Sequence, residues 1–269
     1  MPASEPDWLT VSRRAGERVR AALKRFETTA ERSVETGLGE GGDRTLVIDR
    51  AAEDVVLEEL EATGIPMTVV SEERGELTLH GGGSLYAVVD PVDGSLNAKR
   101  GLPHASVSIA IATGETLADV DFGYIAAIDP ELEWWAVRGE GAFAGGERLA
   151  LLEPGPLELL GLETARPKRL AQAAAAIAEL EARRIRALGS VAVTLAYVAE
   201  GGLDAMLSLR AVRSVDVAAG ALIVREAGGQ VAFPEGGERP SLGLKMRSRV
   251  LAARDAAMLE RLLAAFPGD

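Results

Sequence analysis

Two carboxylates three residues apart, Asp90 and Asp93, place the strongest constraint on what this chain can fold into. An apolar run over residues 85–89 leads into them and predicts a buried strand. Gly94 and Ser95 follow at once and predict a turn or short helix whose free N–H groups face the same place. Carboxylates bind hard cations, and free N–H groups bind phosphate. The segment therefore indicates metal-assisted phosphate chemistry at the end of a strand.

Composition narrows the class of protein further. A chain of 269 residues, 47% hydrophobic and 26% charged, allows one large domain or two closely packed ones with a sizeable core. The formal net charge of −12 argues against extended nucleic-acid binding. The absence of cysteine excludes disulfides and suits a reducing compartment. Because the amino terminus lacks signal-peptide features and no apolar run could span a bilayer, we expect a cytoplasmic protein without a membrane or nucleic-acid partner.

His80 and His104 are the only histidines in the sequence. Their number excludes an imidazole-rich metal site, and a serine–histidine triad would have to use one of these two. We expect both to be surface or edge residues without a chemical role, because histidine is commonly of intermediate burial in folded proteins. The chemistry must therefore come from other side chains.

The first half of the chain predicts helices followed by an antiparallel sheet. Apolar residues at helical spacing predict a first helix over about residues 7–28 and a second helix after Asp49. The glycine-rich residues 36–43 predict a flexible loop. Strands are expected at residues 67–70, 106–112, 120–128 and 133–137, the last three as an antiparallel meander.

The second half alternates helices with strands, which is typical of an α/β unit. Helices are expected over residues 170–185, 190–200 and 216–227 and from Asp255 onward. Strands are expected over residues 203–207 and near Val231 and Val250. We therefore expect an α/β (α+β) protein of two fused halves with a catalytic cleft between them. Residues 1–140 would carry the metal-binding carboxylates, and residues 141–269 would complete the active site.

Acidic residues stand at the edges of predicted elements at five positions: Asp49, Glu72, Asp90, Asp93 and Asp216. Each has an ordinary structural explanation, since aspartate is favoured as a helix N-cap and a glutamate can lie on a solvated turn. Together they favour a site for magnesium, which takes oxygen ligands in near-octahedral order. A lone cluster of carboxylates repels itself, so a cation or a proton must occupy it. An EF-hand calcium loop counted from Asp90 is rejected, because a glycine falls at the twelfth position, where that loop needs glutamate.

Four segments resemble, in order, the signature of the inositol monophosphatase family of magnesium-dependent, often lithium-sensitive phosphatases: residues 71–73 (SEE), 90–97 (DPVDGSLN), 214–220 (SVDVAAG) and 226–229 (EAGG). The resemblance runs from about Thr45 to Gly229. It is closest to the archaeal-type fructose-1,6-bisphosphatase/inositol monophosphatase branch, on the basis of residues 97–103, 106–110 and 186–199. The resemblance implies a layered αβαβα sandwich and a homodimer.

The resemblance also implies a set of site residues. Two or three magnesium ions would be held by Glu72, Asp90, the carbonyl of Val92, Asp93 and Asp216. The catalytic residues would be Asp49, Ser95 and Glu72, with the Ser95 hydroxyl paired with Asp49 to orient the attacking water or shuttle its proton. The phosphate ester would contact Asp93, Gly94, Ser95, Arg186, Ser190, Val191 and Arg210.

Two departures from the inositol-preferring branch bear on the substrate. Val215 stands where that branch has tryptophan, and Leu209 and Arg210 stand where it has a glutamate for inositol hydroxyls. These changes favour a sugar phosphate. The expected function is magnesium-dependent hydrolysis of fructose-1,6-bisphosphate at its 1-phosphate, of inositol-1-phosphate, or of both. The alternatives are a 3′-phosphoadenosine-5′-phosphate nucleotidase, another phosphomonoesterase of the same fold, and a non-catalytic metal- or phosphate-binding protein.

Overall fold

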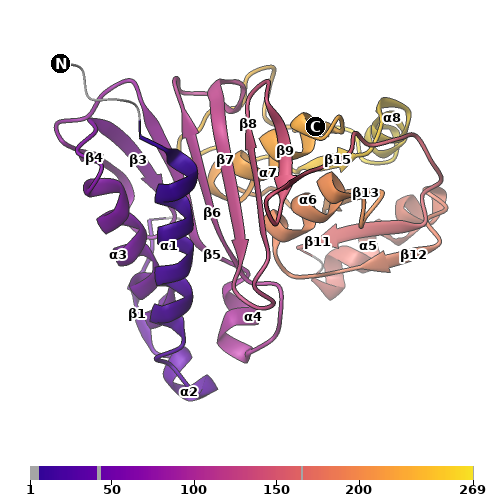
Figure 1. The fold of residues 1–269 in the computed structure, drawn as a ribbon. Helices are drawn as coiled ribbons and strands as arrows, with labels where there is room; N and C mark the ends of the chain where they lie inside the picture. Colours follow the sequence, from indigo (N-terminus) through magenta and orange to yellow (C-terminus); the bar gives the residue numbers. More distant parts are fainter. Residues whose placement is uncertain (1–5, 41–43, 165, 269) are drawn as a thin grey trace.

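The computed structural model describes residues 6–40, 44–164 and 166–268, which form five stacked layers (Figure 1). Helices α1 (Trp8–Leu23) and α3 (Val47–Glu61) cover one face of an eight-stranded sheet, and α6 (Val191–Glu200) and α7 (Ser214–Glu226) cover its other face. A five-stranded sheet packs on the far side of α6 and α7. Helices α5 (Pro167–Glu179) and α8 (Ala256–Ala265) close the stack. The αβαβα sandwich is therefore confirmed.

The eight-stranded sheet contains the predicted antiparallel meander. Its strand order is β10-β9-β8-β7-β6-β5-β3-β4, and β3 pairs with β5 in parallel whereas every other neighbouring pair is antiparallel. The strands are β3 (Met67–Ser71), β4 (Gly75–Leu79), β5 (Tyr86–Asp93), β6 (Ser106–Ala112), β7 (Val120–Ala127), β8 (Glu133–Val137), β9 (Gly141–Ala144) and β10 (Glu147–Arg148). A short 3₁₀ helix, η1 (Leu117–Asp119), precedes β7. All of β6 is buried, because helices cover both faces of the sheet.

The five-stranded sheet has the order β12-β11-β13-β15-β14 and corrects two expectations. Its strands are β11 (Leu159–Glu163), β12 (Arg184–Arg186), β13 (Ala205–Ser208), β14 (Gln230–Ala232) and β15 (Leu251–Ala253). Strand β11 was not predicted. The helix expected over residues 170–185 is wrong at its end, because α5 stops at Glu179 and Glu181 adopts a φ of 53°. Residues 184–186 instead pair in parallel with β11 as an exposed edge strand.

Two expectations near the N-terminus are also corrected. The first helix ends at Leu23 rather than at residue 28. Thr28 begins a separate short helix, α2 (Thr29–Arg32), and its hydroxyl accepts the N–H of Glu31 at 3.2 Å. The loop expected over residues 36–43 is in part a strand, since β1 (Glu35–Leu38) pairs antiparallel with β2 (Arg44–Leu46). Residues 41–43 lie outside the described residues.

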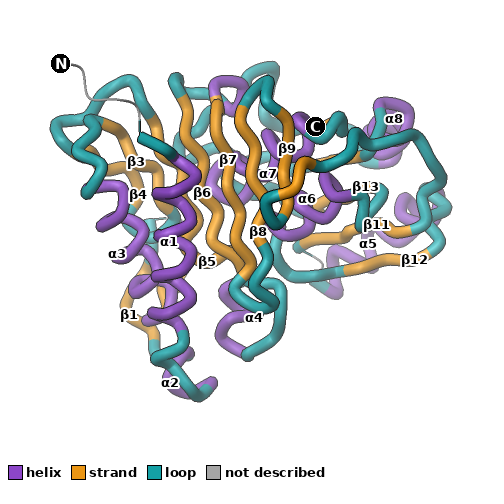
Figure 2. Tube along the Cα trace, viewed as in Figure 1, coloured by secondary structure: helices purple, strands orange, loops and turns teal. Residues whose placement is uncertain are grey.

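Helices α6 and α7 lie between the two sheets, as the purple helices between two sets of orange strands show (Figure 2). Eleven of the 13 residues of α7 are buried, and most of them are small or apolar, as expected of a helix that is covered on all faces. Within the described residues, no helix is long and apolar enough to cross a membrane. At the end of α7, the Glu226 carboxylate accepts the N–H groups of Gly139 at 2.9 Å and Gly141 at 3.0 Å. These bonds fix the last turn of α7 to the connection between β8 and β9.

The contact between β7 and α7 is close enough to require glycine. A Cβ atom on Gly123 would lie 2.8 Å from the carbonyl oxygen of Ala219. Because that neighbour is backbone within a buried helix, it has little room to yield. Strand β7 and helix α7 can therefore approach this closely only because residue 123 has no side chain beyond a hydrogen atom.

A methyl group at position 123 is expected to destabilise the protein. We predict that Gly123→Ala lowers the free energy of unfolding by about 1–3 kcal/mol, the usual cost of overpacking a core, as measured by urea denaturation. Gly243→Ala is the control, because its nearest neighbours are the flexible side chains of Glu76 and Ser241 at 3.3 Å. Equal losses in the two variants would contradict the argument from close approach.

Candidate active site

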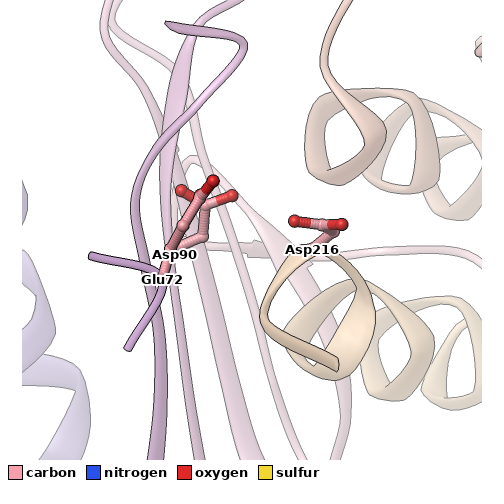
Figure 3. Close-up of side chains that lie close together, drawn as sticks. All are labelled: Glu72, Asp90 and Asp216. Atoms are coloured by element: carbon pink, nitrogen blue, oxygen red, sulfur yellow. The ribbon is translucent and has the colours of Figure 1, made fainter. Parts of the chain in front are cut away.

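The parallel pairing of β3 and β5 brings two predicted metal ligands to the same edge of the sheet. Ser71 at the end of β3 lies opposite Val89 of β5, so Glu72 and Asp90 follow side by side. Asp216, in the first turn of α7, faces them from the other side (Figure 3). One oxygen atom from each of the three carboxylates lies within 4.8 Å of the others. Three acids far apart in the chain thus form one cluster.

The clustered carboxylates are largely shielded from water. Asp90 is 1% exposed and Asp216 7% exposed, and the side chain of Glu72 is 12% exposed. The guanidinium of Arg213 lies beside them, with its Nη2 at 2.5 Å from Oε1 of Glu72 and 3.5 Å from Oδ1 of Asp216. Three carboxylates and one guanidinium leave two uncompensated negative charges when all groups are ionised.

The chain beyond Asp90 is shaped by a break in the β5–β6 register between Asp90 and Asp93. The N–H of Val92 donates to Oδ1 of Asp90 at 3.0 Å, which fixes that side chain over the break. Gly94 then adopts a φ of 85°, and a Cβ atom there would lie 3.0 Å from the carbonyl oxygen of His104. Glycine fits this left-handed turn without strain. Helix α4 (Ser95–Arg100) can therefore begin directly behind the two aspartates.

Asp49 and Asp216 combine a capping role with a place in the site. Each is the third residue of its helix, and one oxygen accepts the N–H of the residue before the helix, from Leu46 at 2.9 Å and from Arg213 at 2.7 Å. The other oxygen of Asp49, Oδ1, is buried and has no hydrogen-bond partner among the described residues. A buried acceptor without a partner is costly, so this atom points to a polar ligand or a proton.

The cluster opens into a cavity of about 620 Å³, a volume suited to a small phosphorylated molecule. Most of the predicted site residues line this cavity: Asp49, Glu72, Asp90, Val92, Asp93, Gly94, Ser95, Val191, Arg210 and Asp216. Neither histidine is among the described residues that line it. The structure therefore brings together most of the residues that the sequence singled out, in one place.

Two predicted substrate residues, Arg186 and Ser190, do not line the cavity. Arg186 is exposed on the edge strand β12, where its Nη1 donates to the carbonyl of Ile185 at 2.9 Å. Ser190 is buried at the start of α6, and its hydroxyl donates to Oδ2 of Asp93 at 2.6 Å. Contacts of these two residues with a substrate stay predictions.

Asp93 and Ser95 each have a hydrogen-bond partner that was not expected. Oδ2 of Asp93 also accepts the N–H of Ala192 at 2.6 Å, so this carboxylate faces α6 and is not one of the three clustered acids. The Ser95 hydroxyl donates to the carbonyl of Val92 at 2.9 Å. Metal binding by Asp93 and by the Val92 carbonyl, and the pairing of Ser95 with Asp49, stay predictions.

Burial raises the pKa of the acids around the cavity. Loss of water is the main reason that the pKa of Asp49 rises from 3.8 to about 7 and the pKa of Glu72 from 4.5 to about 8. Burial, followed by repulsion from Asp216, raises the pKa of Asp93 to about 7. Burial, followed by repulsion from Glu72, raises the pKa of Asp90 well above its usual range. Near neutral pH the site therefore attracts protons or cations.

Glu53 is a buried residue that supports the site and was not expected from the sequence. It is 0% exposed and lies one helical turn after Asp49 on α3. Its carboxylate accepts the Ser71 hydroxyl at 2.6 Å and the N–H of Arg74 at 3.0 Å, which fixes the turn that carries Glu72. The spacing of four residues from Asp49 on one helix face was the available signal.

Glu163, at the end of β11, is a second buried residue that was missed. Its Oε1 accepts the N–H of Leu188 at 3.0 Å and the hydroxyl of Thr194 at 2.7 Å, and its Oε2 accepts the N–H of Gly189 at 3.1 Å. These bonds hold the loop that leads to Ser190. No local signal identified Glu163, because β11 itself was not predicted. Among the polar residues that line the cavity, Arg44, Glu73, Thr164 and Arg166 were also missed.

The donor set fits a divalent hard cation. Carboxylate oxygens are the ligands that magnesium prefers, and the uncompensated charge and the unpartnered oxygen of Asp49 lie in one cavity. The layered fold and this acidic site define a metal-dependent phosphoric monoester hydrolase. The chain belongs to the inositol monophosphatase family, whose model matches residues 8–268.

Two curated relatives resemble the chain over nearly its whole length. The fructose-1,6-bisphosphatase/inositol-1-monophosphatase of Methanothermobacter thermautotrophicus is 35% identical over 95% of both chains. The protein of the same name from Thermococcus kodakarensis is 34% identical over 98% of this chain and 99% of its own. The crystal structure of the extragenic suppressor protein suhB from Bartonella henselae superposes with a TM-score of 0.82 and 26% identity, covering 98% of this chain and all of its own.

We predict that the metal-free protein loses stability as the pH rises from about 5 to 8.5. The unfolded chain releases these protons near the ordinary values of 3.8 and 4.5, whereas the folded acids keep them up to pKa values of about 7 to 8. Between those values the folded state binds more protons, so the free energy of unfolding falls as the pH rises. Calorimetry in EDTA at pH 5.5, 7 and 8.5 measures this fall.

Saturating magnesium is expected to raise the melting temperature more at pH 8.5 than at pH 5.5, because the ion takes the place of protons. Glu72→Gln is the matched variant and should reduce the dependence of stability on pH. A melting temperature that does not change with pH or with magnesium would contradict the assignment of this cluster.

Proposed function

We propose that this protein is a magnesium-dependent phosphomonoesterase of a small sugar or polyol phosphate. The substrate would be fructose-1,6-bisphosphate, hydrolysed at its 1-phosphate, or inositol-1-phosphate, or both. One observation carries the proposal: the carboxylates of Glu72, Asp90 and Asp216 converge within 4.8 Å beside a cavity of about 620 Å³. The names of the two curated relatives support the substrate class.

Two or three magnesium ions would be held by the acids of the cavity. Glu72, Asp90 and the carbonyl of Val92 would hold one ion, and Asp90, Asp93 and Asp216 would hold another. When bound, magnesium supplies a water of lowered pKa and neutralises the charge of the phosphate. Asp90 is central to this arrangement because it would contact both ions.

The protein's own groups would bind and orient the reactants. The N–H groups of Gly94 and Ser95 would bind the phosphate oxygens. Asp49, whose pKa burial raises to about 7, is suited to accept a proton from the attacking water near neutral pH, with the Ser95 hydroxyl as its partner. Phosphoryl transfer needs such positioning and charge neutralisation more than covalent chemistry. The scarcity of histidine and the absence of cysteine agree with this mechanism.

Arg210 is the proposed contact for a second phosphate. It lines the same cavity, and its backbone N–H donates to the hydroxyl of Thr164 at 3.0 Å, which fixes its position in the wall. A guanidinium pairs with phosphate through two parallel hydrogen bonds. Arg186, on the exposed edge strand β12, would take part only if the substrate extends beyond the cavity.

We further propose that the protein is a cytoplasmic homodimer. Each chain would consist of two halves, residues 1–140 and 141–269. The family resemblance supports the dimer, and the absence of cysteine supports a reducing compartment. The cluster supports the division into halves, because Glu72 and Asp90 come from the first half and Asp216 from the second. Strands β9 and β10 complete the first sheet although they follow residue 140.

Asp90→Asn is expected to lower magnesium-dependent turnover by at least about a hundredfold, a loss typical of removing one preorganised charge from an active site. The substrates are fructose-1,6-bisphosphate, inositol-1-phosphate, 3′-phosphoadenosine-5′-phosphate and histidinol phosphate, each with and without magnesium. Circular dichroism should show a retained fold. Asp121→Asn, outside the cavity, is the control. Near-normal turnover in Asp90→Asn, or no hydrolysis of any of the four by the unmodified protein, would refute the proposal.

Arg210→Ala is expected to raise KM for fructose-1,6-bisphosphate roughly tenfold, the effect of losing a hydrogen bond to a charged group. The KM for inositol-1-phosphate, which has a single phosphate, should change much less. Steady-state kinetics with both substrates measure the difference, and Arg169→Ala on the exposed face of α5 is the control. Equal effects on both substrates would remove Arg210 from the second phosphate.

A further inference from the structure

The guanidinium of Arg213 lies inside the carboxylate cluster, where the proposed metal ions would also lie. Its Nη2 is 2.5 Å from Oε1 of Glu72 and 3.5 Å from Oδ1 of Asp216, and its side chain is only 12% exposed. Water screens such a partly buried contact little. Arg213 therefore neutralises part of the charge of the cluster without any added ion.

Arg213 is placed there by the start of α7. It directly precedes the helix, and its backbone N–H donates to Oδ2 of Asp216 at 2.7 Å. Its side chain reaches Glu72, which lies in the turn directly after β3 and lines the same cavity. The backbone bond is part of the helix cap, whereas the side-chain contact depends on rotatable bonds. The two contacts can therefore respond differently to an ion.

We propose that the Arg213 guanidinium serves as the counter-cation of the carboxylate cluster when no metal is bound. When magnesium binds Glu72, it displaces the guanidinium from that carboxylate. The inference rests on the metal site of the proposed function. A guanidinium and a divalent cation repel each other and compete for the same carboxylate oxygens. Arg213 therefore stabilises the metal-free protein and weakens metal binding.

A different role for Arg213 gives the opposite result. If its guanidinium oriented Glu72 as a ligand while remaining bound to it, removal of the arginine would weaken magnesium binding, as loss of an outer partner of a metal ligand usually does. The sign of the change in magnesium affinity therefore separates exchange from orientation.

Arg213→Met tests the exchange, because methionine removes the charge and retains much of the side-chain volume. Arg183→Met is the matched control, since it removes an arginine from an exposed pair with Glu158 outside the cavity. Magnesium chloride is titrated calorimetrically into the metal-free, full-length protein without substrate. We expect Arg213→Met to bind magnesium about fivefold or more tightly than the unmodified protein, as removal of a nearby positive charge implies, and Arg183→Met to bind it unchanged.

Thermal unfolding gives a second readout. Metal-free Arg213→Met should melt below the metal-free unmodified protein, and saturating magnesium should reduce the difference. A crystal structure of the unmodified protein with bound magnesium, in which the contact between Arg213 and Glu72 should be broken, tests the exchange even if the variant does not fold.

Unchanged or weaker magnesium binding by Arg213→Met overturns the proposal. So does a magnesium-bound structure in which the contact of 2.5 Å is intact. Failure of the unmodified protein to bind magnesium at all would overturn the proposed function itself, which separates the two failures.

Discussion

The parallel pairing of β3 with β5 is the contact on which the site depends. It places Glu72 beside Asp90, and a shift of one residue in this register would turn one of the two side chains to the opposite face. The buried carboxylate of Glu53 fixes the turn after β3, and α7 brings Asp216 to the same edge. Negative charge thus accumulates where water is excluded. That combination raises the proton affinity of the acids, and it is the same combination that favours divalent cations.

The features that could be predicted from the sequence are those encoded locally. The break after Asp90 and the left-handed turn at Gly94 follow from a short segment rich in turn-forming residues, so the segment indicated the site by itself. The meander was predicted because apolar runs separated by turn residues are visible in a short window. Asp216 was expected to be a possible helix N-cap, but Arg213 is the N-cap and Asp216 is the third residue of α7; the resemblance supplied its role in the site.

The features that were missed depend on residues distant in the sequence. Residues 184–186 were expected to be helical from their local pattern. They form a strand because they pair in parallel with the edge of β11. From the local sequence, Glu53 resembles an exposed acid on a helix. Its buried role depends on the hydrogen bond from the hydroxyl of Ser71. The orientation of Asp93 also depends on a distant partner, because the hydroxyl of Ser190, 97 positions later, donates to one of its oxygens. In each case a partner far along the chain decides the role.

Helices α6 and α7 each pack against both sheets, so the two sheets share one central layer of helices. A fragment of residues 1–140 would lack both helices, so one apolar face of its sheet would be bare to solvent, although the core between the other face and α1 and α3 would remain. Melting is therefore expected to be a single cooperative event. Since the carboxylate cluster takes Glu72 and Asp90 from the first sheet's edge and Asp216 from α7, binding of a cation to the cluster and the stability of the whole molecule are thermodynamically linked.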